Sequence, residues 1–474
     1  MRLGLALFRR QARYKPNMHR LILAACFLAA LGLPAIADDQ VPASARLRQL
    51  QRELGTNEGR AIEAFWRERQ SAAAPLIEHL DGTDGKVVLV TFLWRGNAAT
   101  ENVFVIALDQ VQFANAAYFE RGRMARLGET DVWYRSYRMP CDLRFSYRFS
   151  VNDPGTPAVA TSSEATARRM AQLRPDPLNP IHYASRSGDS SVAELPCAAP
   201  QPESKERDGI AHGEVRSEVF AGKSGERHAL QIYVPPGAGS RRSMALVVLI
   251  GGQFAPEFPV PAILDNLIAE RRIGPTIAVS IGFADMAAYV KASQSDEGFA
   301  HEVAKELLPW LRARFPISDD PRRVVIAGAS APGAGALFVA MRSPELFGNV
   351  LTQAGGYAYP HPAAPDELIP VAHPDAELLA RELASRPALP LRVFLGVGTM
   401  DDVPWEGKDP RHGYATVLVS ARHLRDVLEA RGYCFAYREF GGGHEALAWR
   451  GTFAEGIAWL LGKDACAPHR RTAP

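Results

Sequence analysis

One strand-turn-helix pattern restricts the fold of this 474-residue chain more than any other feature. Residues 324–327 are apolar, the next six are Gly-Ala-Ser-Ala-Pro-Gly, and the run after them begins with small residues and continues as Leu-Phe-Val-Ala-Met. The apolar run predicts a buried strand, and a first turn rich in Gly and Ala lets the following helix lie close against it. The sequence therefore predicts a sharp turn with Ser330 at its apex and a helix that stops before Pro344.

Ser330 has the surroundings that a nucleophilic serine needs. A hydroxyl is a weak nucleophile, so it must stand on an exposed turn within reach of a base and of backbone N–H donors. His444 is the candidate base, because the three glycines at 441–443 let the backbone turn back toward the serine without a side-chain clash. The alternative for the serine segment is an ordinary strand-to-helix turn.

A carboxylate is expected to orient the imidazole of His444. Asp401 follows the apolar run 391–398 and is our choice, with adjacent Asp402 as the fallback, because the sequence does not show which of them turns inward. Either acid could instead be a solvated loop residue or a helix cap. The chain order Ser, Asp, His is the one that α/β-hydrolases use, so the pattern predicts an ester or related acyl hydrolase.

Backbone donors for a developing oxyanion are expected at two places. Ala331 follows the nucleophile directly, and its N–H is intact although Pro332 stands where the usual G-x-S-x-G pattern has its second glycine. The second donor is expected at Gly252 or Gln253, after the apolar strand predicted at 245–250. A plain tight turn would predict the same glycine.

The length and the patterning predict two domains. From residue 209 to 474, apolar runs alternate with helical segments, which predicts an α/β domain with a mostly parallel sheet and helices on both faces. Residues 38–183 contain a helical segment at 42–69 and then change to period two, which predicts a smaller β-sandwich. The polar residues 184–208 are expected to form the linker.

The run from Leu143 to Phe149 shows the period of two most clearly. Its apolar residues alternate with Arg144, Ser146 and Arg148. This alternation predicts an antiparallel strand with one buried face and one solvated face.

Short motifs in both halves resemble the ferric enterobactin (enterochelin) esterase family, which joins an esterase D type α/β-hydrolase to an N-terminal immunoglobulin-like domain. The motifs lie at 90–95, 128–133, 176–180, 249–254, around Ser330, at 398–401 and, as Gly-Gly-His-Glu-Ala-Leu-Ala-Trp-Arg, at 442–450. Each motif alone is weak evidence for the family, but finding them in the family's order along the chain is specific.

The resemblance implies hydrolysis of the tri-serine lactone of an iron-loaded catecholate siderophore, with iron only as part of the substrate and no other cofactor. Trp449 and Arg450 in the last motif, and Arg95 and Trp133 in the first domain, are the candidate substrate contacts. Aromatic rings and guanidinium groups suit flat, anionic catecholate rings. The alternative for the aromatic residues of the first domain is ordinary sandwich core and cross-strand pairing.

Three positions depart from the family pattern. Tyr289 and Ala292 stand where the family usually has Arg and Glu, with Lys291 nearby, and Pro332 replaces a glycine. These changes keep two alternatives open. One is an esterase for acetyl, feruloyl or other small carboxylic esters on the same scaffold, and the other is a siderophore-binding protein on a hydrolase scaffold that no longer cuts.

Residues 1–37 are expected to be an export signal. Arg20 precedes the uncharged run 21–33, and the small residues at 35–37 fit a cleavage site before Asp38. The run is too short to span a bilayer, so no stable membrane insertion is expected. Export to a bacterial periplasm is the simplest interpretation, with lipidation at Cys26 as a less favoured alternative because few apolar residues precede it.

The cysteines agree with an exported protein. Cys141 and Cys197 lie in the first half, and Cys434 and Cys466 in the second, so an oxidising compartment would allow one disulfide in each domain. Free buried thiols are the alternative.

Charge and composition exclude some functions and leave others undetermined. The formal net charge is +2, and no basic stripe with interleaved aromatic residues is present, so nucleic acid is not an expected partner. No His, Cys or carboxylate cluster has the spacing of metal ligands, so no metal site is expected. The oligomeric state is not determined by the sequence.

Overall fold

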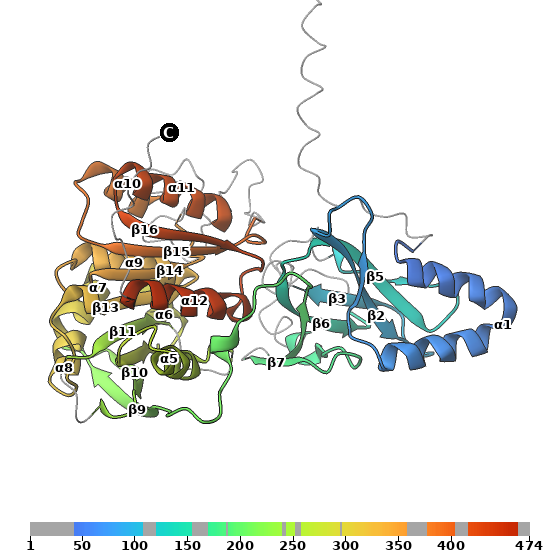
Figure 1. Cartoon of the computed structure of the whole chain (residues 1–474), viewed down its shortest axis with the longest axis horizontal. Helices are drawn as coiled ribbons and strands as arrows, with labels where there is room; N and C mark the ends of the chain where they lie inside the picture. Colours follow the sequence, from blue (N-terminus) through green and yellow to red (C-terminus); the bar gives the residue numbers. More distant parts are fainter. Residues whose placement is uncertain are drawn as a thin grey trace, which may run out of the picture.

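The computed structural model describes residues 42–107, 120–153, 169–185, 188–238, 243–251, 257–293, 296–357, 377–402 and 416–462. In these ranges the chain forms two domains that lie side by side (Figure 1). The expected export signal, residues 1–37, lies outside the described residues. Among the described helices, none is long and apolar enough to cross a membrane.

The first domain is a β-sandwich with one long helix. Its two four-stranded sheets have the orders β1-β2-β5-β4 and β3-β6-β8-β7, with antiparallel neighbours throughout. Phe92 and Phe145, from different sheets, pack together in the core. The elements are α1 (Ala45–Gln70), β1 (Leu76–His79), β2 (Val87–Arg95), β3 (Val103–Ala107), β4 (Ala125–Arg126), β5 (Val132–Pro140), β6 (Arg144–Val151), β7 (His182–Ser185) and β8 (Gly188–Glu194).

Helix α1 covers one sheet of the sandwich on the side away from the second domain (Figure 1). Ser44 caps it by accepting a hydrogen bond from the N–H of Leu47. Leu50 and Trp66 are buried against the sheet, where they join Leu93 in a second apolar cluster. The predicted helical segment at 42–69 is confirmed.

Two sequence expectations for this domain need correction. The segment 184–208, expected to be a linker, contains β8, which pairs with β6 inside the sandwich. Its polar residues with scattered Pro and Gly indicated a linker, but Ser190 and Ser191 are buried in the sheet. Strand β6 is also buried on both faces, because Arg144 and Ser146 on its expected outer face make contacts that include the second domain.

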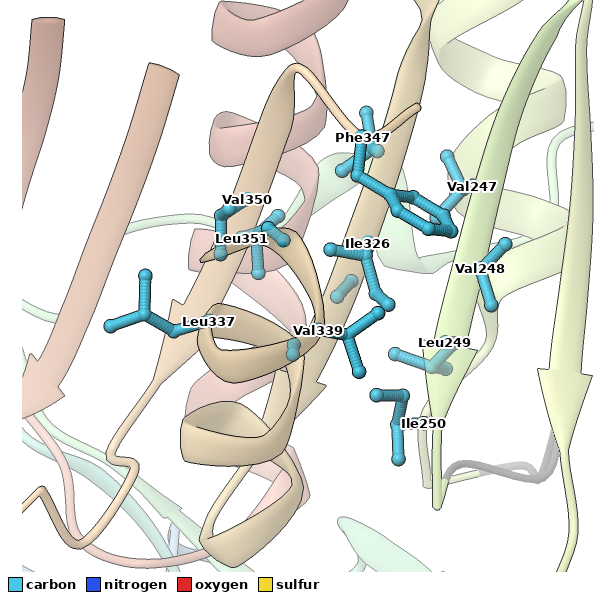
Figure 2. Close-up of a cluster of buried hydrophobic side chains, with 14 of the residues drawn as sticks. Val247, Val248, Leu249, Ile250, Ile326, Leu337, Val339, Phe347, Val350 and Leu351 are labelled. Carbon is cyan, nitrogen blue, oxygen red and sulfur yellow. The ribbon is translucent and has the colours of Figure 1, made fainter. Parts of the chain in front are cut away.

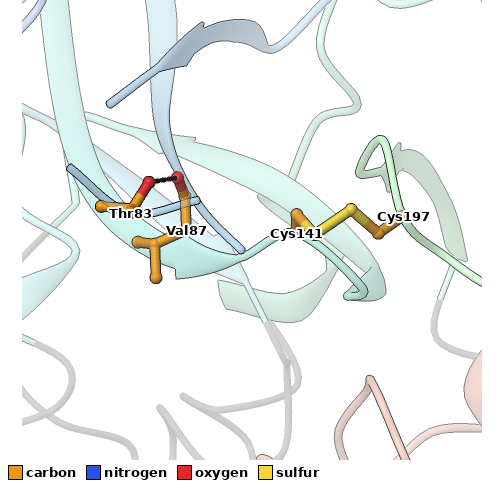
Figure 3. Close-up of a disulfide and its surroundings, with 4 residues drawn as sticks. All are labelled: Thr83, Val87, Cys141 and Cys197. Carbon is orange, nitrogen blue, oxygen red and sulfur yellow. Dashed lines mark hydrogen bonds between the residues drawn. A yellow bond between two sulfur atoms is a disulfide. The ribbon is translucent and has the colours of Figure 1, made fainter. Parts of the chain in front are cut away.

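A disulfide joins Cys141, after β5, to Cys197, after β8 (Figure 3). The Cys197 N–H also donates to the Cys141 carbonyl over 2.7 Å, so the bridge fastens the end of the sandwich. In the same view, the Thr83 hydroxyl donates to the carbonyl of Val87 at the start of β2. Cys434 is disulfide-bonded as well, but its expected partner Cys466 lies outside the described residues.

The second domain is an α/β-hydrolase fold around an eight-stranded sheet of order β16-β15-β14-β13-β11-β12-β10-β9. Neighbours from β12 to β16 are parallel, and β10 pairs antiparallel with both β9 and β12. The strands are β9 (Glu214–Ala221), β10 (Arg227–Val234), β11 (Ala245–Ile250), β12 (Thr276–Ile281), β13 (Val324–Ala329), β14 (Asn349–Gln353), β15 (Arg392–Gly398) and β16 (Cys434–Phe440).

Helices cover both faces of this sheet, as predicted. Helices α5 and α12 pack together on one face, in front in Figure 1, and α9 packs with α6, α7 and α10 in another layer. The helical elements are η2 (Pro202–Ser204), α5 (Val260–Ala269), α6 (Met286–Ser293), α7 (Glu297–Glu302), η4 (Val303–Leu307), α8 (Leu308–Arg312), η5 (Pro321–Arg323), α9 (Ala331–Arg342), α10 (Leu378–Ser385), α11 (Val417–Ala430) and α12 (Ala446–Leu461).

The centre of the second domain is a continuous apolar core. Figure 2 shows part of it, where Val248 of β11, Ile326 of β13 and Val339 of α9 lie together. All three are at most 1% exposed. This packing holds β13 and α9 rigidly, and the turn between them carries Ser330.

Candidate active site

Three side chains meet at the carboxyl ends of neighbouring parallel strands. Ser330 follows β13, Asp401 follows β15 and His444 follows β16. Ligands and substrates of open α/β sheets bind outside this edge. We refer to Ser330, Asp401 and His444 as the triad.

Ser330 stands at the apex of the predicted turn. Its backbone is at φ 61° and ψ −146°, a region that costs a non-glycine residue roughly 1–3 kcal/mol. Two backbone hydrogen bonds hold this conformation, from the Ser330 N–H to the Gln353 carbonyl at 2.8 Å and from the Gly333 N–H to the Ser330 carbonyl at 2.7 Å. The half-buried hydroxyl is thereby projected toward His444.

The packing around the turn explains how Pro332 is accommodated. A Cβ at Gly328 would collide with the Pro332 carbonyl, and one at Gly251 would lie 2.8 Å from the Pro332 ring. Gly333 packs closely on Thr352, where a Cβ would be 3.0 Å from the hydroxyl. Glycines on both sides therefore make room for proline in the first turn of α9, where its missing N–H has no intrahelical acceptor to lose.

The imidazole of His444 connects the other two triad members. Its Nε2 lies 2.7 Å from Ser330 Oγ and its Nδ1 lies 3.0 Å from Asp401 Oδ1. The Asp401 side chain is 2% exposed, and its second oxygen accepts the Gly398 N–H at 3.2 Å. Asp402 is exposed at the surface, so the structure brings Asp401 and not Asp402 to the histidine.

Only one of the expected oxyanion donors can be described. Ala331 is the first residue of α9, so its N–H has no acceptor within the helix and lies directly after the nucleophile. Gly252 and Gln253 lie outside the described residues.

Tyr289 on α6 is a further functional candidate. The sequence marked its position as a departure from the family pattern but did not indicate a role for the tyrosine. Burial raises the pKa of Tyr289, and the polar side chains of Ser330 and Ser293 oppose that shift. A Cβ at Gly251 would lie 3.4 Å from the tyrosine ring, so the ring also borders the end of β11. The neutral phenol of Tyr289 thus lies near Ser330.

The first domain contacts the loop that carries His444. The Arg144 N–H donates to the Gly441 carbonyl at 3.1 Å, and a Cβ at Gly441 would collide with the backbone of Asp142. A Cβ at Gly442 would lie 2.7 Å from Ala448. The glycines were expected to serve a turn, but neither Gly441 nor Gly442 has a positive φ, and what they provide is this close packing.

Glu445, next to the triad histidine, makes a contact between the domains through three hydrogen-bond distances. Its carboxylate accepts the Ser146 hydroxyl at 2.6 Å and the Ser146 N–H at 3.0 and 3.2 Å. Met400, next to Asp401, packs against the core of the sandwich. Both loops that carry triad partners of Ser330 therefore touch the first domain, which sequence spacing did not reveal.

Trp449 and Arg450 lie on α12, one turn beyond His444. The Trp449 ring meets the His444 ring edge to face, with centroids 4.9 Å apart. Arg450 donates to Gln201 at 2.8 Å and lies over the Tyr183 ring, at the seam between the domains. Trp449 thus borders the triad, whereas the described contacts of Arg450 are between domains.

Arg95 and Trp133 are engaged inside the first domain. Arg95 pairs with Asp131 at 2.8 Å and with Glu63, and it lies over the Trp66 ring. Trp133 is 9% exposed and belongs to the sandwich core. Because Glu63 and Trp66 are on α1, away from the second domain (Figure 1), these contacts correspond to the packing alternative and not to substrate contact.

The hydrogen-bonded arrangement of Ser330, His444 and Asp401 is suited to proton transfer between the serine and the imidazole. Among the described residues, one group of His and carboxylate side chains is close enough to share a metal ion, namely Glu226, His228 and Glu302, and it contains no triad member.

Comparisons with known proteins match both domains. The Esterase family matches residues 222–460, and the family "Enterochelin esterase, N-terminal" matches residues 89–204. The iron(III) salmochelin esterase of Escherichia coli O6:H1 is 28% identical over 425 residues, which are 88% of this chain and 98% of that protein. The iron(III) enterobactin esterase of Dickeya dadantii is 26% identical over 430 residues, 85% of this chain and 93% of that protein.

Solved structures agree. The ferric enterobactin esterase of Salmonella typhimurium superposes with a TM-score of 0.66 at 25% identity, covering 84% of this chain and 98% of that one. The enterobactin esterase of Shigella flexneri, crystallised in the presence of enterobactin, gives 0.63 at 25% identity and covers 84% and 97%. Both domains match, and they follow one another in the expected order, so this chain belongs to the enterochelin esterase family.

Proposed function

We propose that this chain is a serine esterase that hydrolyses the ester bonds of a catecholate siderophore of the enterobactin class. The observation that carries the proposal is the continuous hydrogen-bonded line from Ser330 Oγ through His444 to Asp401 at the active edge of the sheet. Relatives named as enterobactin and salmochelin esterases match nearly their full length, which supports this substrate class.

The geometry supports acyl transfer in two halves. With Nδ1–H donating to Asp401, the Nε2 of His444 is free to take the Ser330 proton as the serine oxygen attacks the ester carbonyl. The oxyanion that forms can accept the Ala331 N–H. When the tetrahedral intermediate collapses, the imidazolium returns its proton to the leaving alcohol oxygen, and an acyl-serine remains. Water then repeats the sequence and releases the acid.

Tyr289 is proposed to assist at the nucleophile. Its phenol lies near Ser330, and burial raises the pKa of the phenol, so it stays protonated. When the serine oxygen becomes an ester oxygen, the O–H group can turn to the new tetrahedral centre. The resemblance led us to expect an arginine here, so this position supplies a neutral donor in place of a cation.

The central experiment is product analysis with matched variants. Iron-loaded enterobactin, the metal-free compound and a chromogenic acetyl ester are each incubated with the parent chain, Ser330→Ala and Ser385→Ala, and the products are identified by mass spectrometry. We expect the parent and the exposed-serine control to release linear fragments of enterobactin and Ser330→Ala to release none. Enterobactin turnover that survives Ser330→Ala would contradict the mechanism.

A second candidate is a general carboxylic ester hydrolase, and Tyr289 near Ser330 is the observation that favours it, because a neutral phenol stands where the family usually has a cationic arginine. The same experiment separates the two. Cleavage of the acetyl ester without cleavage of either form of enterobactin would replace the first proposal by this one. A parent chain that binds enterobactin and cuts none of the three would establish the non-catalytic alternative.

We also infer that the chain is exported to an oxidising compartment such as the periplasm. The Cys141–Cys197 disulfide supports this, because such bridges persist outside the reducing cytosol. The mature protein isolated from a periplasmic fraction should begin at Asp38. Recovery in the cytosol with residues 1–37 retained would contradict export.

A further inference from the structure

A compact group of donor atoms lies at the edge of the sheet opposite the one that carries His444. Glu226 precedes β10, His228 is on β10, and Glu302 ends α7. Each offers one nitrogen or oxygen, and these atoms all lie within 4.8 Å of one another. Strand β10 is next to the edge strand β9, whereas β16 forms the other edge.

His228 is buried without the hydrogen bonds that such a ring normally has. Its side chain is 6% exposed, and among the described residues neither ring nitrogen makes a hydrogen bond. The ring is enclosed by Phe220, Phe283 and Phe299, with centroids 6.1 to 6.4 Å away. A buried ring nitrogen in an apolar enclosure calls for a further partner, and an ion is one.

Glu302 points at the same space. Its side chain is 9% exposed, and Oε1 lies 3.2 Å from His228 Nε2, outside hydrogen-bond geometry. Burial raises the pKa of Glu302, His228 opposes this, and Glu226 and Glu306 raise it further. The imidazole thus lies close to two carboxyl groups, those of Glu226 and Glu302, and a cation between them would offset the repulsion between the carboxylates.

The backbone holds these ligands in place. The Gly222 N–H donates to the Glu226 carbonyl at 2.9 Å and closes the turn between β9 and β10. The Lys223 N–H donates to Glu306 Oε2 at 2.7 Å, which joins this turn to the helical segment after α7. A Cβ at Gly222 would collide with Glu302 Oε1, so the turn lies directly against the carboxylate.

We propose that Glu226, His228 and Glu302 bind one divalent transition-metal ion, which fastens the β9–β10 hairpin to α7. One imidazole with two carboxylates favours Zn²⁺, and also Mn²⁺ or Fe²⁺, over the all-oxygen sites of Ca²⁺ and Mg²⁺. The site contains no triad member, and it does not depend on the esterase proposal. The sequence did not indicate it, because Glu302 is far from the other two ligands along the chain.

The test uses Zn²⁺ alone as the probe. The full chain is stripped with a chelator, dialysed and titrated with Zn²⁺ by calorimetry, and thermal unfolding is followed with and without the ion. We expect one Zn²⁺ per chain and a higher melting temperature with Zn²⁺, since the ion binds the folded state. His228→Gln and Glu302→Gln should each weaken binding by about tenfold or more and abolish the thermal shift.

His423→Gln is the matched control. His423 Nδ1 lies 2.8 Å from Glu377, so it is also a His–Glu pair, but it is half exposed, and among the described residues no third ligand accompanies it. This variant should bind Zn²⁺ like the parent. A cooperative thermal unfolding transition checks that each variant is folded. Glu226→Gln, at the more accessible ligand, repeats the test should a buried substitution prevent folding.

Two results would overturn the proposal. One is a parent chain that shows no saturable Zn²⁺ binding. The other is Zn²⁺ binding that persists unchanged in the folded His228→Gln, Glu302→Gln or Glu226→Gln chain, which would show that Zn²⁺ binds elsewhere on the surface.

Discussion

The contact between Ser146 and Glu445 should hold the triad histidine in place. Ser146→Ala removes the 2.6 Å hydrogen bond from the hydroxyl and keeps the two longer contacts from the backbone N–H. Ser146 is 4% exposed, so water does not readily replace the lost donor. Hydrogen bonds to charged groups contribute about 1.5–3 kcal/mol, and we take about 2 kcal/mol as the loss.

Part of this loss should appear in catalysis, because Glu445 is covalently adjacent to His444. If about 1.4 kcal/mol of it serves to position the imidazole, kcat/KM falls about tenfold. The assay is hydrolysis of a chromogenic acetyl ester, which needs the triad but little of the siderophore pocket. The free energy of unfolding is measured in parallel with urea.

Ser150→Ala is the matched control on the same strand. The Ser150 hydroxyl also donates to a carboxylate over 2.6 Å, that of Asp153, but this contact stays within the first domain. It should lower stability by a similar amount and leave kcat/KM unchanged. Equal losses of kcat/KM in the two variants, or no loss in Ser146→Ala, would refute the reasoning. A cycle with Glu445→Gln should also show non-additivity well above the roughly 0.5 kcal/mol expected of independent sites.

Three further outcomes are expected. Asp401→Asn should lower kcat by about 10⁴, because the imidazole of His444 loses its correct tautomer. Asp402→Asn, at the exposed neighbouring residue, should keep a kcat near that of the parent chain. The opposite result would assign the orienting carboxylate to Asp402. Tyr289→Phe should lower kcat by up to about tenfold, the effect of one neutral hydrogen bond of about 0.5–1.5 kcal/mol, and an unchanged kcat would remove the phenol from the mechanism. Gly441→Ala should destabilise the fold by about 1–3 kcal/mol in urea unfolding, because its Cβ would meet the backbone of the first domain. Gly274→Ala, with open space around the new Cβ, should be nearly neutral, and equal costs for the two would contradict this account.

The features predicted best from the sequence are those that neighbouring residues determine. The turn at Ser330 follows from one apolar run and the small residues after it, and the alternation of strands and helices predicts the parallel sheet. Asp401 and His444 could be placed because each directly follows a strand, and parallel strands end at the same edge.

What could not be predicted depends on contacts between distant segments. The alternating pattern predicted that Arg144 and Ser146 lie on a solvated face of β6, because nothing in the pattern shows that the second domain covers this face. Ser190 and Ser191 were predicted to lie in a linker because they are polar, and their polarity does not indicate the sheet in which they are buried. Arg95 belongs to a motif in the expected order, but its side chain turns to α1.

The seam between the domains has a consequence for when the protein becomes active. The nucleophile is built within one domain, whereas the proton acceptor lies close to the end of the chain, on a loop that the sandwich helps to shape. Domains generally fold as units and in the order in which the chain becomes available, so the sandwich can form before that loop is in place. The serine is therefore in place before its proposed base, and the proposed hydrolytic activity would arise only when α12 docks.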